Sequence, residues 1–243
     1  MNRVLKECAL DESCAYIKDQ RQTTHYKIID QCSISQCSAL IERGWRRFGS
    51  MFFRPICSEC TACESLKIDA DNYRFSKSAK RVIKKNAHLK TVIRRPALTQ
   101  EHLELFNKYH SHMEEKKGWD NQSVTTRSYY ISFVHGYNDF GYEICYYDGD
   151  RLIGVDLIDI LEEGISSIYF YYDPEYAHLS LGRYSLYRQI MLAQRHGLRW
   201  IYLGYYVEEC PSLAYKNQYQ PTYLLEGRPE EAEAPCWHMY EPT

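Results

Sequence analysis

The sequence predicts an α/β fold in which a smaller, basic and cysteine-rich N-terminal lobe precedes a C-terminal lobe built on a mixed sheet. Three observations predict it. After about residue 96, strand-like and helix-like segments alternate with short joints. Seven of the ten cysteines lie before that point. The chain has 243 residues, of which 44% are hydrophobic and 26% charged, so disorder is excluded as its main state.

In the first lobe, the pattern over Ser35–Arg43 predicts a helix that ends at Gly44, and Phe48–Pro55 predicts a strand. Ser76 is a suitable N-cap for a second helix that continues to about His88. Apolar side chains would lie on the inner face of that helix and its many lysines and arginines on the outer face.

In the second lobe, residues 99–117 have helical spacing of apolar residues, and an Asp148-Gly149 turn predicts a hairpin. The remaining elements are expected in the order strand, helix, strand, at Ser166–Tyr172, Ser180–Arg195 and Arg199–Tyr206, with the hairpin strands at Tyr142–Tyr147 and Arg151–Ile160. A strand, helix, strand unit is a right-handed crossover between parallel strands, so the sheet should be mixed.

We expect a domain boundary close to Pro96, because proline disfavours a helical conformation in the residue before it. The predicted units are residues 1–95, residues 96–228 and an acidic tail over residues 229–243. The tail begins with PEEAEAP and is expected to be mobile.

The sequence contains no run of 18 apolar residues, so no membrane-spanning helix is expected. The segment Met1–Asp11 has no apolar stretch long enough for a signal peptide, which predicts a cytoplasmic protein with reduced thiols.

The motif Cys57-x-x-Cys60-x-x-Cys63 has a spacing that lets one loop direct three thiols at one ion. Tetrahedral zinc and [4Fe-4S] clusters each need four ligands, and Cys14 is the predicted fourth. Other candidates for the fourth ligand are Cys8, His25, Cys32 and Cys37. The alternative is that the three thiols only pack in a loop.

Basic residues gather in two clusters. Arg46 and Arg47 lie in the aromatic-rich segment ERGWRRFGSMFFRP, and Arg74–Arg95 carries nine lysines or arginines and no acidic residue although the whole chain has a net charge of -2. Cations among aromatic side chains suit RNA, because they neutralise phosphates and stack on unpaired bases. A solvated basic helix face is the simpler alternative.

The segment around Leu181-Gly182-Arg183-Tyr184, where a loop leads into a helix, resembles the acyl-donor corner of the GNAT acyltransferase fold. Acetyl-CoA-dependent enzymes have more glycines at that corner, and this chain has one, so a pyrophosphate site is poorly supported.

Several motifs together resemble the aminoacyl-tRNA protein transferases over about residues 12–228. The N-terminal motifs are Cys14-x-Tyr16, RGWRRFG from Arg43, the three-cysteine loop, and Ser76-x-Ser78-x-x-Arg81; the C-terminal ones include Tyr169-x-Tyr171-x-Asp173-Pro174, Tyr202-Leu203-Gly204-Tyr205 and Tyr215-Lys216. The cysteine spacing is most similar to that of the bacterial branch of the family.

The resemblance implies a GNAT-like C-terminal lobe and an enzyme that transfers leucine, with arginine as the alternative, from charged tRNA to proteins that begin with Asp or Glu. Such transfer marks proteins for N-degron degradation. The aminoacyl ester is already activated, so the chemistry needs no enzyme nucleophile and no cofactor. A zinc ion or iron–sulfur cluster at the cysteines would have a structural role.

Candidate site residues follow from this interpretation. We expect Asp159 and Asp173 to assist proton transfer, and Tyr169 and Tyr205 to shape the ester site. Arg183 and Lys216 are expected to bind the acidic side chain of the acceptor. The predicted tRNA-binding residues are Arg46, Arg47, Lys80, Arg81, Lys84 and Lys85.

Two other functions remain open on the sequence alone. One is a CoA-dependent N-acetyltransferase that carries a metal-binding lobe, and the other is a non-enzymatic RNA-binding or redox-sensing protein. Incubation with charged tRNA and peptides of different N-termini distinguishes them.

Overall fold

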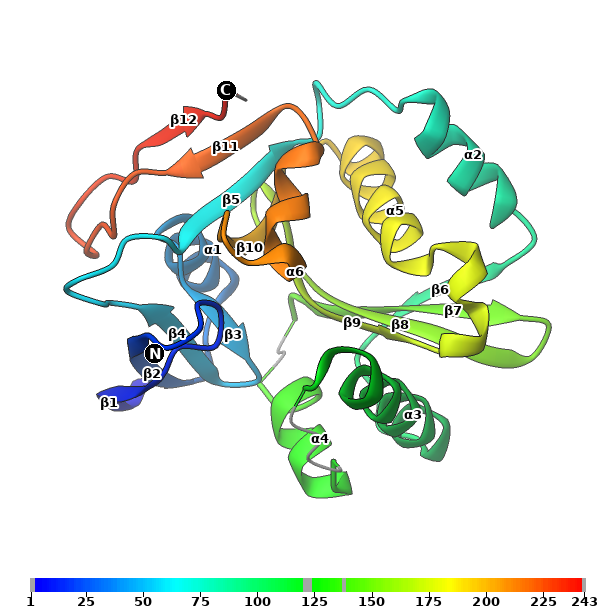
Figure 1. Cartoon of the computed structure of the whole chain (residues 1–243), viewed down its shortest axis with the longest axis horizontal. Coiled ribbons are helices and arrows are strands. Elements are labelled where there is room, and N and C mark those ends of the chain that lie inside the picture. The colour runs from blue at the N-terminus through cyan, green and yellow to red at the C-terminus, as the bar shows by residue number, and fades with distance from the viewer. Residues whose placement is uncertain (1–2, 120–123, 137–138, 242–243) are drawn as a thin grey trace.

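A computed structural model describes residues 3–119, 124–136 and 139–241. In these ranges the strands form two sheets (Figure 1). The larger has eight strands in the order β12-β11-β5-β10-β9-β8-β7-β6, and the smaller has four in the order β1-β2-β4-β3.

The larger sheet is mixed, as predicted. Its strands are β5 (Glu64–Asp69), β6 (Lys90–Arg94), β7 (Gly141–Asp148), β8 (Arg151–Ile160), β9 (Gly164–Tyr172), β10 (Trp200–Tyr206), β11 (Thr222–Leu225) and β12 (Trp237–Met239). β9 and β10 are parallel and are joined by the crossover helix α5 (Leu181–His196), whereas the other strand pairs are antiparallel. The predicted α/β class with a mixed sheet is therefore confirmed.

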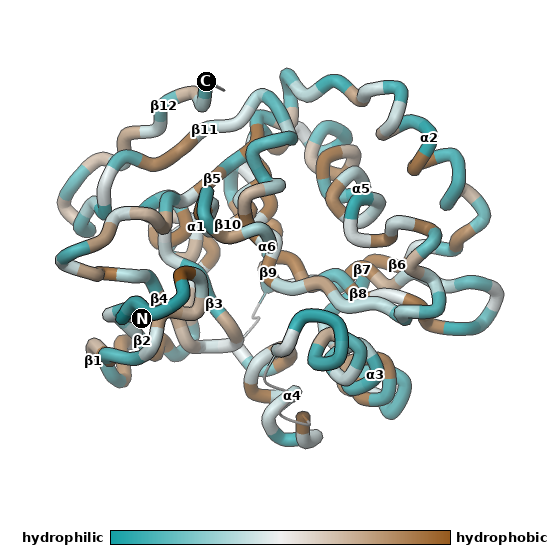
Figure 2. The backbone as a smooth tube through the Cα atoms, viewed as in Figure 1, coloured by the Kyte–Doolittle hydropathy of each residue, from teal (hydrophilic) through white to brown (hydrophobic). Residues whose placement is uncertain are grey.

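Helices cover both faces of this sheet (Figure 1). On one face lie α5 and α2 (Lys77–Lys85), and on the other α3 (Gln100–Lys117) and α4 (Thr126–Phe133). Figure 2 shows hydrophobic residues along the strands of the sheet and on part of each helix. The buried apolar side chains accordingly form one core beneath α5 and a second beneath α3 and α4.

The smaller sheet contains the long hairpin of β1 (Arg3–Ser13) and β2 (Arg21–Asp30), followed by β4 (Met51–Pro55) and β3 (Arg46–Phe48). It packs with α1 (Ile34–Glu42) around the buried ring of Trp45. The single strand predicted over Phe48–Pro55 is a hairpin instead, because Gly49 adopts a φ of 55° and turns the chain between β3 and β4.

The remaining elements are short helices. They are the 3-10 helix η1 (Pro174–Leu179), the helix α6 (Pro211–Ala214) and the 3-10 helix η2 (Tyr215–Gln218). α2 ends at Lys85 rather than near His88, and Ser76 caps it as predicted by accepting a hydrogen bond from the Ala79 amide. The larger sheet takes strands from both sides of the predicted boundary near residue 96, since β5 and β6 precede it.

The expectation of a mobile acidic tail is wrong for the described part of residues 229–243. Arg54 donates to the carbonyl oxygen of Pro229 and pairs with Glu230, and Lys27 pairs with Glu231 at 2.8 Å. β12 then adds to the edge of the larger sheet. The acidic residues are held because they meet cations of the smaller sheet.

Within the described ranges, the structure contains no helix that is long and apolar enough to cross a membrane.

Candidate active site

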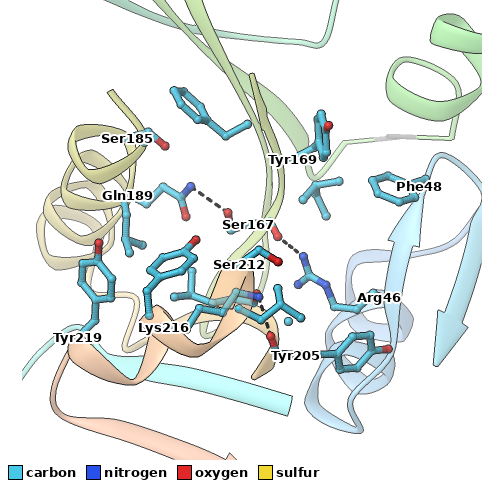
Figure 3. Close-up of a pocket in the computed structure, with 18 of the residues that line it drawn as sticks. Arg46, Phe48, Ser167, Tyr169, Ser185, Gln189, Tyr205, Ser212, Lys216 and Tyr219 are labelled. Atoms are coloured by element: carbon cyan, nitrogen blue, oxygen red, sulfur yellow. Dashed lines mark hydrogen bonds between the residues drawn. The ribbon is translucent and has the colours of Figure 1, made fainter. Parts of the chain in front are cut away.

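A cavity of about 770 Å³ lies where the two sheets meet α5 and η2. Its size is within the usual range for ligand pockets. It is lined by side chains that are far apart in the sequence, such as Phe48, Tyr169 and Lys216 (Figure 3). Arg183, Ser212 and Tyr215 also line it and are exposed, so the cavity opens to solvent.

The cavity exists because β9 and β10 separate. The two strands pair in parallel only over Gly164–Ser166 and Trp200–Tyr202. Beyond that point the guanidinium of Arg46 lies between them, donating to Ser166 Oγ at 3.2 Å, to Tyr202 O at 3.5 Å and to the carbonyl of Ser167 (Figure 3). Arg46 thus replaces the hydrogen bonds that a continued ladder would make.

Gly204 makes room for this arginine. It adopts a φ of 74°, and a Cβ atom at this position would lie 2.7 Å from Arg46 Nε. Glycine is therefore required both for its backbone conformation and for the close approach of the guanidinium.

Lys216 satisfies the next carbonyl groups of β10. Its Nζ donates to Tyr205 O at 2.6 Å and to Leu203 O at 2.9 Å. Burial, reinforced by the charge of Arg46, lowers the pKa of Lys216 to about 7. The amine is therefore poised between its charged and neutral forms near neutral pH.

The charged residues lining the cavity are all cationic: Arg46, Arg47, Arg183 and Lys216. No aspartate or glutamate lines it among the described residues. Arg47 is neutralised by its pair with Asp159, so an anion entering the site meets the charges of Arg46, Arg183 and Lys216.

An aromatic wall faces these cations. Tyr169 stacks on Phe133 with ring centroids 5.6 Å apart, meets Phe48 edge-on at 6.2 Å, and its hydroxyl lies 2.9 Å from His110 Nε2. Tyr109, Trp119 and Tyr172 extend the lining. Burial raises the pKa of Tyr169 and lowers that of His110, so both side chains are neutral at pH 7.

A buried polar network lies at the bottom of the cavity. Asp156 in β8 is completely buried and accepts hydrogen bonds from Ser185 Oγ at 2.8 Å and from Gln189 Nε2 at 2.8 Å. Gln189 Nε2 also donates to Ser167 Oγ at 3.2 Å (Figure 3). Burial raises the pKa of Asp156 to about 7, although its two hydrogen-bond donors oppose the shift.

Sequence comparisons assign this architecture to a family. A family model described as the arginine-tRNA-protein transferase C terminus matches residues 101–226, and the corresponding N-terminus model matches residues 12–81. The chain belongs to the arginine-tRNA-protein transferase family. This is the family that the sequence motifs resemble, so that prediction is confirmed.

Several curated proteins align with this transferase over nearly the whole length of both chains. A protein of Campylobacter jejuni strain 81116 is 49% identical over 92% of this chain and 93% of its own, and one of Helicobacter hepaticus is 41% identical over 93% and 94%. A protein of Pseudomonas aeruginosa strain PAO1 is 31% identical over 87% and 89%. All three are named aspartate/glutamate leucyltransferase.

Among solved structures, L-PGS from Bacillus licheniformis is similar over 65% of this chain and 52% of that chain, with 16% identity and a TM-score of 0.41.

The two carboxylates predicted to assist proton transfer lie outside the cavity lining of this transferase. Asp159 is completely buried and pairs with Arg47, whose Nε is 2.7 Å from Asp159 Oδ2. Asp173 caps η1 and pairs with Lys108 at 2.7 Å and with Arg151 at 2.5 Å. Burial opposes ionisation of Asp173, but these hydrogen bonds and charges outweigh it and lower its pKa.

The structure brings four other predicted residues together, because Tyr169, Tyr205, Arg183 and Lys216 all line the cavity. Tyr205 is nearly buried, and its hydroxyl donates to Gly44 O and Phe53 O at 3.2 Å. It therefore joins the two sheets as well as shaping the cavity.

The predicted tRNA-binding residues occupy two sites. Lys80, Arg81, Lys84 and Lys85 are exposed on α2, and Lys85 Nζ also donates to His178 O at 2.6 Å. Arg46 and Arg47, in contrast, are held by hydrogen bonds beside the cavity. The predicted tRNA-binding cations thus separate into an exposed helix face and a pair beside the cavity, in which Arg47 is buried and Arg46 half-buried.

The four predicted metal ligands are neighbours. Burial, followed by the charges of Cys14, Cys57 and Cys60, raises the pKa of Cys63 to about 12. Cys14 Sγ accepts a hydrogen bond from the Ile17 amide at 3.4 Å, and Cys57 Sγ accepts one from the Thr23 amide at 3.4 Å. Backbone donors to sulfur stabilise the thiolates that a metal would need.

A different group of potential ligands is more compact. Within the described ranges, His102, Glu143 and Cys145 are the three side chains whose ligand atoms all lie within 4.8 Å of one another. Arg94 Nε donates to Glu143 at 2.6 Å, and Thr99 Oγ1 lies 2.7 Å from His102 Nδ1. These partners make it a satisfied polar network rather than an open ligand set.

The sequence motifs did not indicate a role for Asp156, Ser185, Gln189 and Ser167. A signal was present, because Asp156 stands between Val155 and Leu157 in a strand that is otherwise apolar at its centre. A buried carboxylate needs hydrogen-bond donors. Ser185 and Gln189 can both supply them, because residues four positions apart lie on the same face of a helix.

Proposed function

We propose that this chain transfers leucine from aminoacylated tRNA to the α-amino group of proteins whose first residue is Asp or Glu. The names of its full-length relatives support this function. The observation that carries it is the chemistry of the cavity, in which cations face an aromatic wall and no acidic residue is present among the described lining residues.

The aromatic wall favours leucine over arginine as the transferred residue. A leucyl side chain buries apolar surface against rings such as Phe48 and Tyr169. An arginyl guanidinium would need a carboxylate partner, because a buried charge without one is strongly disfavoured. The cavity lining supplies none among the described residues.

The cations favour an acidic acceptor. Arg183 and Lys216 line the side of the cavity formed by α5 and η2, and a carboxylate bound there gains charge-assisted hydrogen bonds. We propose these two residues as the acceptor-binding pair, and Tyr169 and Tyr205 as residues that shape the ester site.

The chemistry needs positioning more than activation. The ester of charged tRNA is already reactive, and an α-amino group with a pKa near 8 is about one-tenth neutral at pH 7. Holding the amine against the ester carbonyl carbon supplies most of the acceleration. No covalent enzyme intermediate is required.

We propose α2 as part of the surface that binds the body of the tRNA. Lys80, Arg81 and Lys84 project into solvent from one short helix whose residues are mainly hydrophilic (Figure 2). Exposed cations in this arrangement neutralise phosphates without reading sequence. The reaction would take place in the cytoplasm, where charged tRNA is present, and would supply substrates to N-degron proteolysis.

We also propose that Cys14, Cys57, Cys60 and Cys63 hold a structural zinc ion or iron–sulfur cluster. Four thiolates are a suitable ligand set for either. For a single zinc ion their sulfur atoms would have to move closer together, since no three of them lie within 4.8 Å of one another. Arg228 donates to the carbonyl groups of Cys57 and Cys60 and orders the loop. Metal analysis and absorption spectra of the wild type and of Cys60→Ser test this, with Cys236→Ser, an exposed cysteine, as the control.

The transfer itself is tested with labelled Leu-tRNA or Arg-tRNA and peptides that begin with Asp, Glu or Ala. We expect leucine on the Asp and Glu peptides and little on the Ala peptide. Transfer of arginine in preference to leucine, or equal labelling of all three peptides, would contradict the proposal. A parallel reaction with acetyl-CoA should yield no acetylated peptide.

A further inference from the structure

The leucyl transfer proposed above leaves the buried network of Asp156, Ser185 and Gln189 without a role. Burying a carboxylate in the middle of a sheet costs free energy unless hydrogen bonds or an opposite charge compensate for the lost water. Asp156 has three hydrogen bonds from two side chains, Ser185 and Gln189, and both of these line the cavity. The network therefore connects a buried acid to the space where substrates bind.

Gln189 presents an unused acceptor. Its amide nitrogen is committed to Asp156 and Ser167, which fixes the orientation of the side chain. Its Oε1 is buried and finds no hydrogen-bond donor among the described residues. Figure 3 shows the Gln189 side chain extending from α5 into the cavity. A buried acceptor without a donor is costly in the empty protein and indicates a donor on the ligand.

We propose that Gln189 and Ser185 bind the attacking amine of the acceptor protein and that Ser185 passes the proton of this amine to Asp156. The inference deepens the proposed leucyl transfer and rests on it. An amine has N–H groups to offer Gln189 Oε1, and Ser185 Oγ already donates its own proton to Asp156.

The reaction balances without a further reactant. The amine nitrogen forms a bond to the leucyl carbonyl carbon and gives a proton to Ser185 Oγ, while the hydroxyl proton of Ser185 moves to Asp156. The bond from the carbonyl carbon to the terminal ribose oxygen of the tRNA then breaks. The ribose oxygen keeps the electron pair and receives the proton back, which returns Asp156 to its ionised form.

The surroundings of Asp156 suit a group that gains and loses a proton. Tyr146 from β7 is an ionisable group that interacts with Asp156, and Tyr184 and Arg188 from α5 in turn interact with Tyr146. Burial raises the pKa of Tyr146 well above its ordinary value, so this tyrosine does not compete for the proton at neutral pH. Burial also holds the pKa of Asp156 at about 7.

The test is the pH dependence of single-turnover transfer from Leu-tRNA to an Asp peptide by the full-length enzyme. Below pH 7 the wild type must lose a proton from both the amine and Asp156, so log rate should rise with a slope of about two. Lys216, whose pKa is also about 7, stays mainly protonated below that pH. In Asp156→Asn the amine is then the group whose deprotonation limits the rate, so the slope should fall to about one and the rate at pH 7 should drop by about 100-fold. Asp69→Asn, another fully buried aspartate outside the cavity lining, is the matched control and should keep the wild-type slope.

The serine is tested in the same assay. Ser185→Ala should lose the proton path and Ser185→Thr should recover most of the rate, while Ser38→Ala on α1 should behave as wild type. The inference is overturned if the wild type is active and Asp156→Asn, folded by circular dichroism, keeps its rate and a slope of two. Absence of transfer by the wild type would instead refute the proposed function.

Infrared difference spectra of the wild type against Asp156→Asn, recorded without substrates, give an independent readout of the protonation of Asp156. A carboxyl band that titrates near pH 7 supports the inference. A band that titrates near pH 4 overturns it.

Discussion

Arg47 and Asp159 form an ion pair in which both side chains are completely buried, with Arg47 Nε 2.7 Å from Asp159 Oδ2. Arg47 belongs to β3 of the smaller sheet and Asp159 to β8 of the larger one. The pair therefore ties the two sheets together behind the cavity. This explains why an arginine in a basic segment is unavailable to phosphates.

Removing one partner should destabilise the protein strongly. Asp159→Asn leaves a buried guanidinium without its counter-charge, and we expect a loss of about 3–5 kcal/mol in the free energy of unfolding. Urea denaturation measures it. Arg151→Met, which breaks the half-exposed pair with Asp173, should change stability by less than about 1 kcal/mol. Equal effects of the two variants would contradict the structural role of the buried pair.

Gly204→Ala should disturb the cavity by displacing Arg46. The new methyl group would lie 2.7 Å from Arg46 Nε at a residue with positive φ. Gly197→Ala is the matched control, because Gly197 also has a positive φ (67°) but a Cβ there has nothing within 4 Å. We expect both variants to lose about 1 kcal/mol of stability from backbone strain and only Gly204→Ala to lose transfer activity as well. Retention of full activity by a folded Gly204→Ala would show that the position of Arg46 is unimportant.

Asp156 predicts an unusual dependence of stability on pH. Its pKa is about 7 in the folded protein and near 4 when unfolded, so the folded state binds the proton more tightly. The stabilisation that this bound proton gives the folded state is fully present below pH 4 and is lost as the pH rises to 7. Relative to wild type, Asp156→Asn should therefore gain stability between pH 4 and pH 8, by up to roughly 4 kcal/mol. Denaturation curves at several pH values measure the difference, and a difference that does not change with pH would contradict it.

Neutralising α2 should weaken tRNA binding in a salt-dependent way. For each phosphate that Lys80, Arg81 or Lys84 no longer neutralises, the slope of log affinity against log salt should become shallower by about 0.7–0.9. Replacing Lys116 and Lys117, exposed cations at the end of α3 on the other face of the sheet, controls for net charge (Figure 1). If both sets of variants change the slope equally, α2 is not a specific part of the tRNA surface.

Much of the fold could be predicted because its signals are local. Ser76 caps α2 and Gly197 ends α5, as their positions in the sequence indicate. The strands β8 and β10 follow from apolar runs with clear boundaries, and the parallel pairing of β9 and β10 follows from the intervening helix.

The candidate site was harder to predict because burial decides the role of each charged residue. Asp156, Asp159 and Asp173 are all aspartates at or near strands β8 and β9, and the sequence does not reveal their partners. Two of them meet cations from other elements, whereas Asp156 meets the neutral donors Ser185 and Gln189. Such pairings depend on tertiary contacts between residues 22 to 112 positions apart.

The hydrogen bonds from Arg228 to the carbonyl oxygens of Cys57 and Cys60 have a consequence for biosynthesis. A ribosome makes the thiol-bearing loop long before it makes residue 228, so the nascent polypeptide carries this loop without the arginine that orders it. Loading of any metal and final maturation of the loop would then wait until Arg228 has left the ribosome.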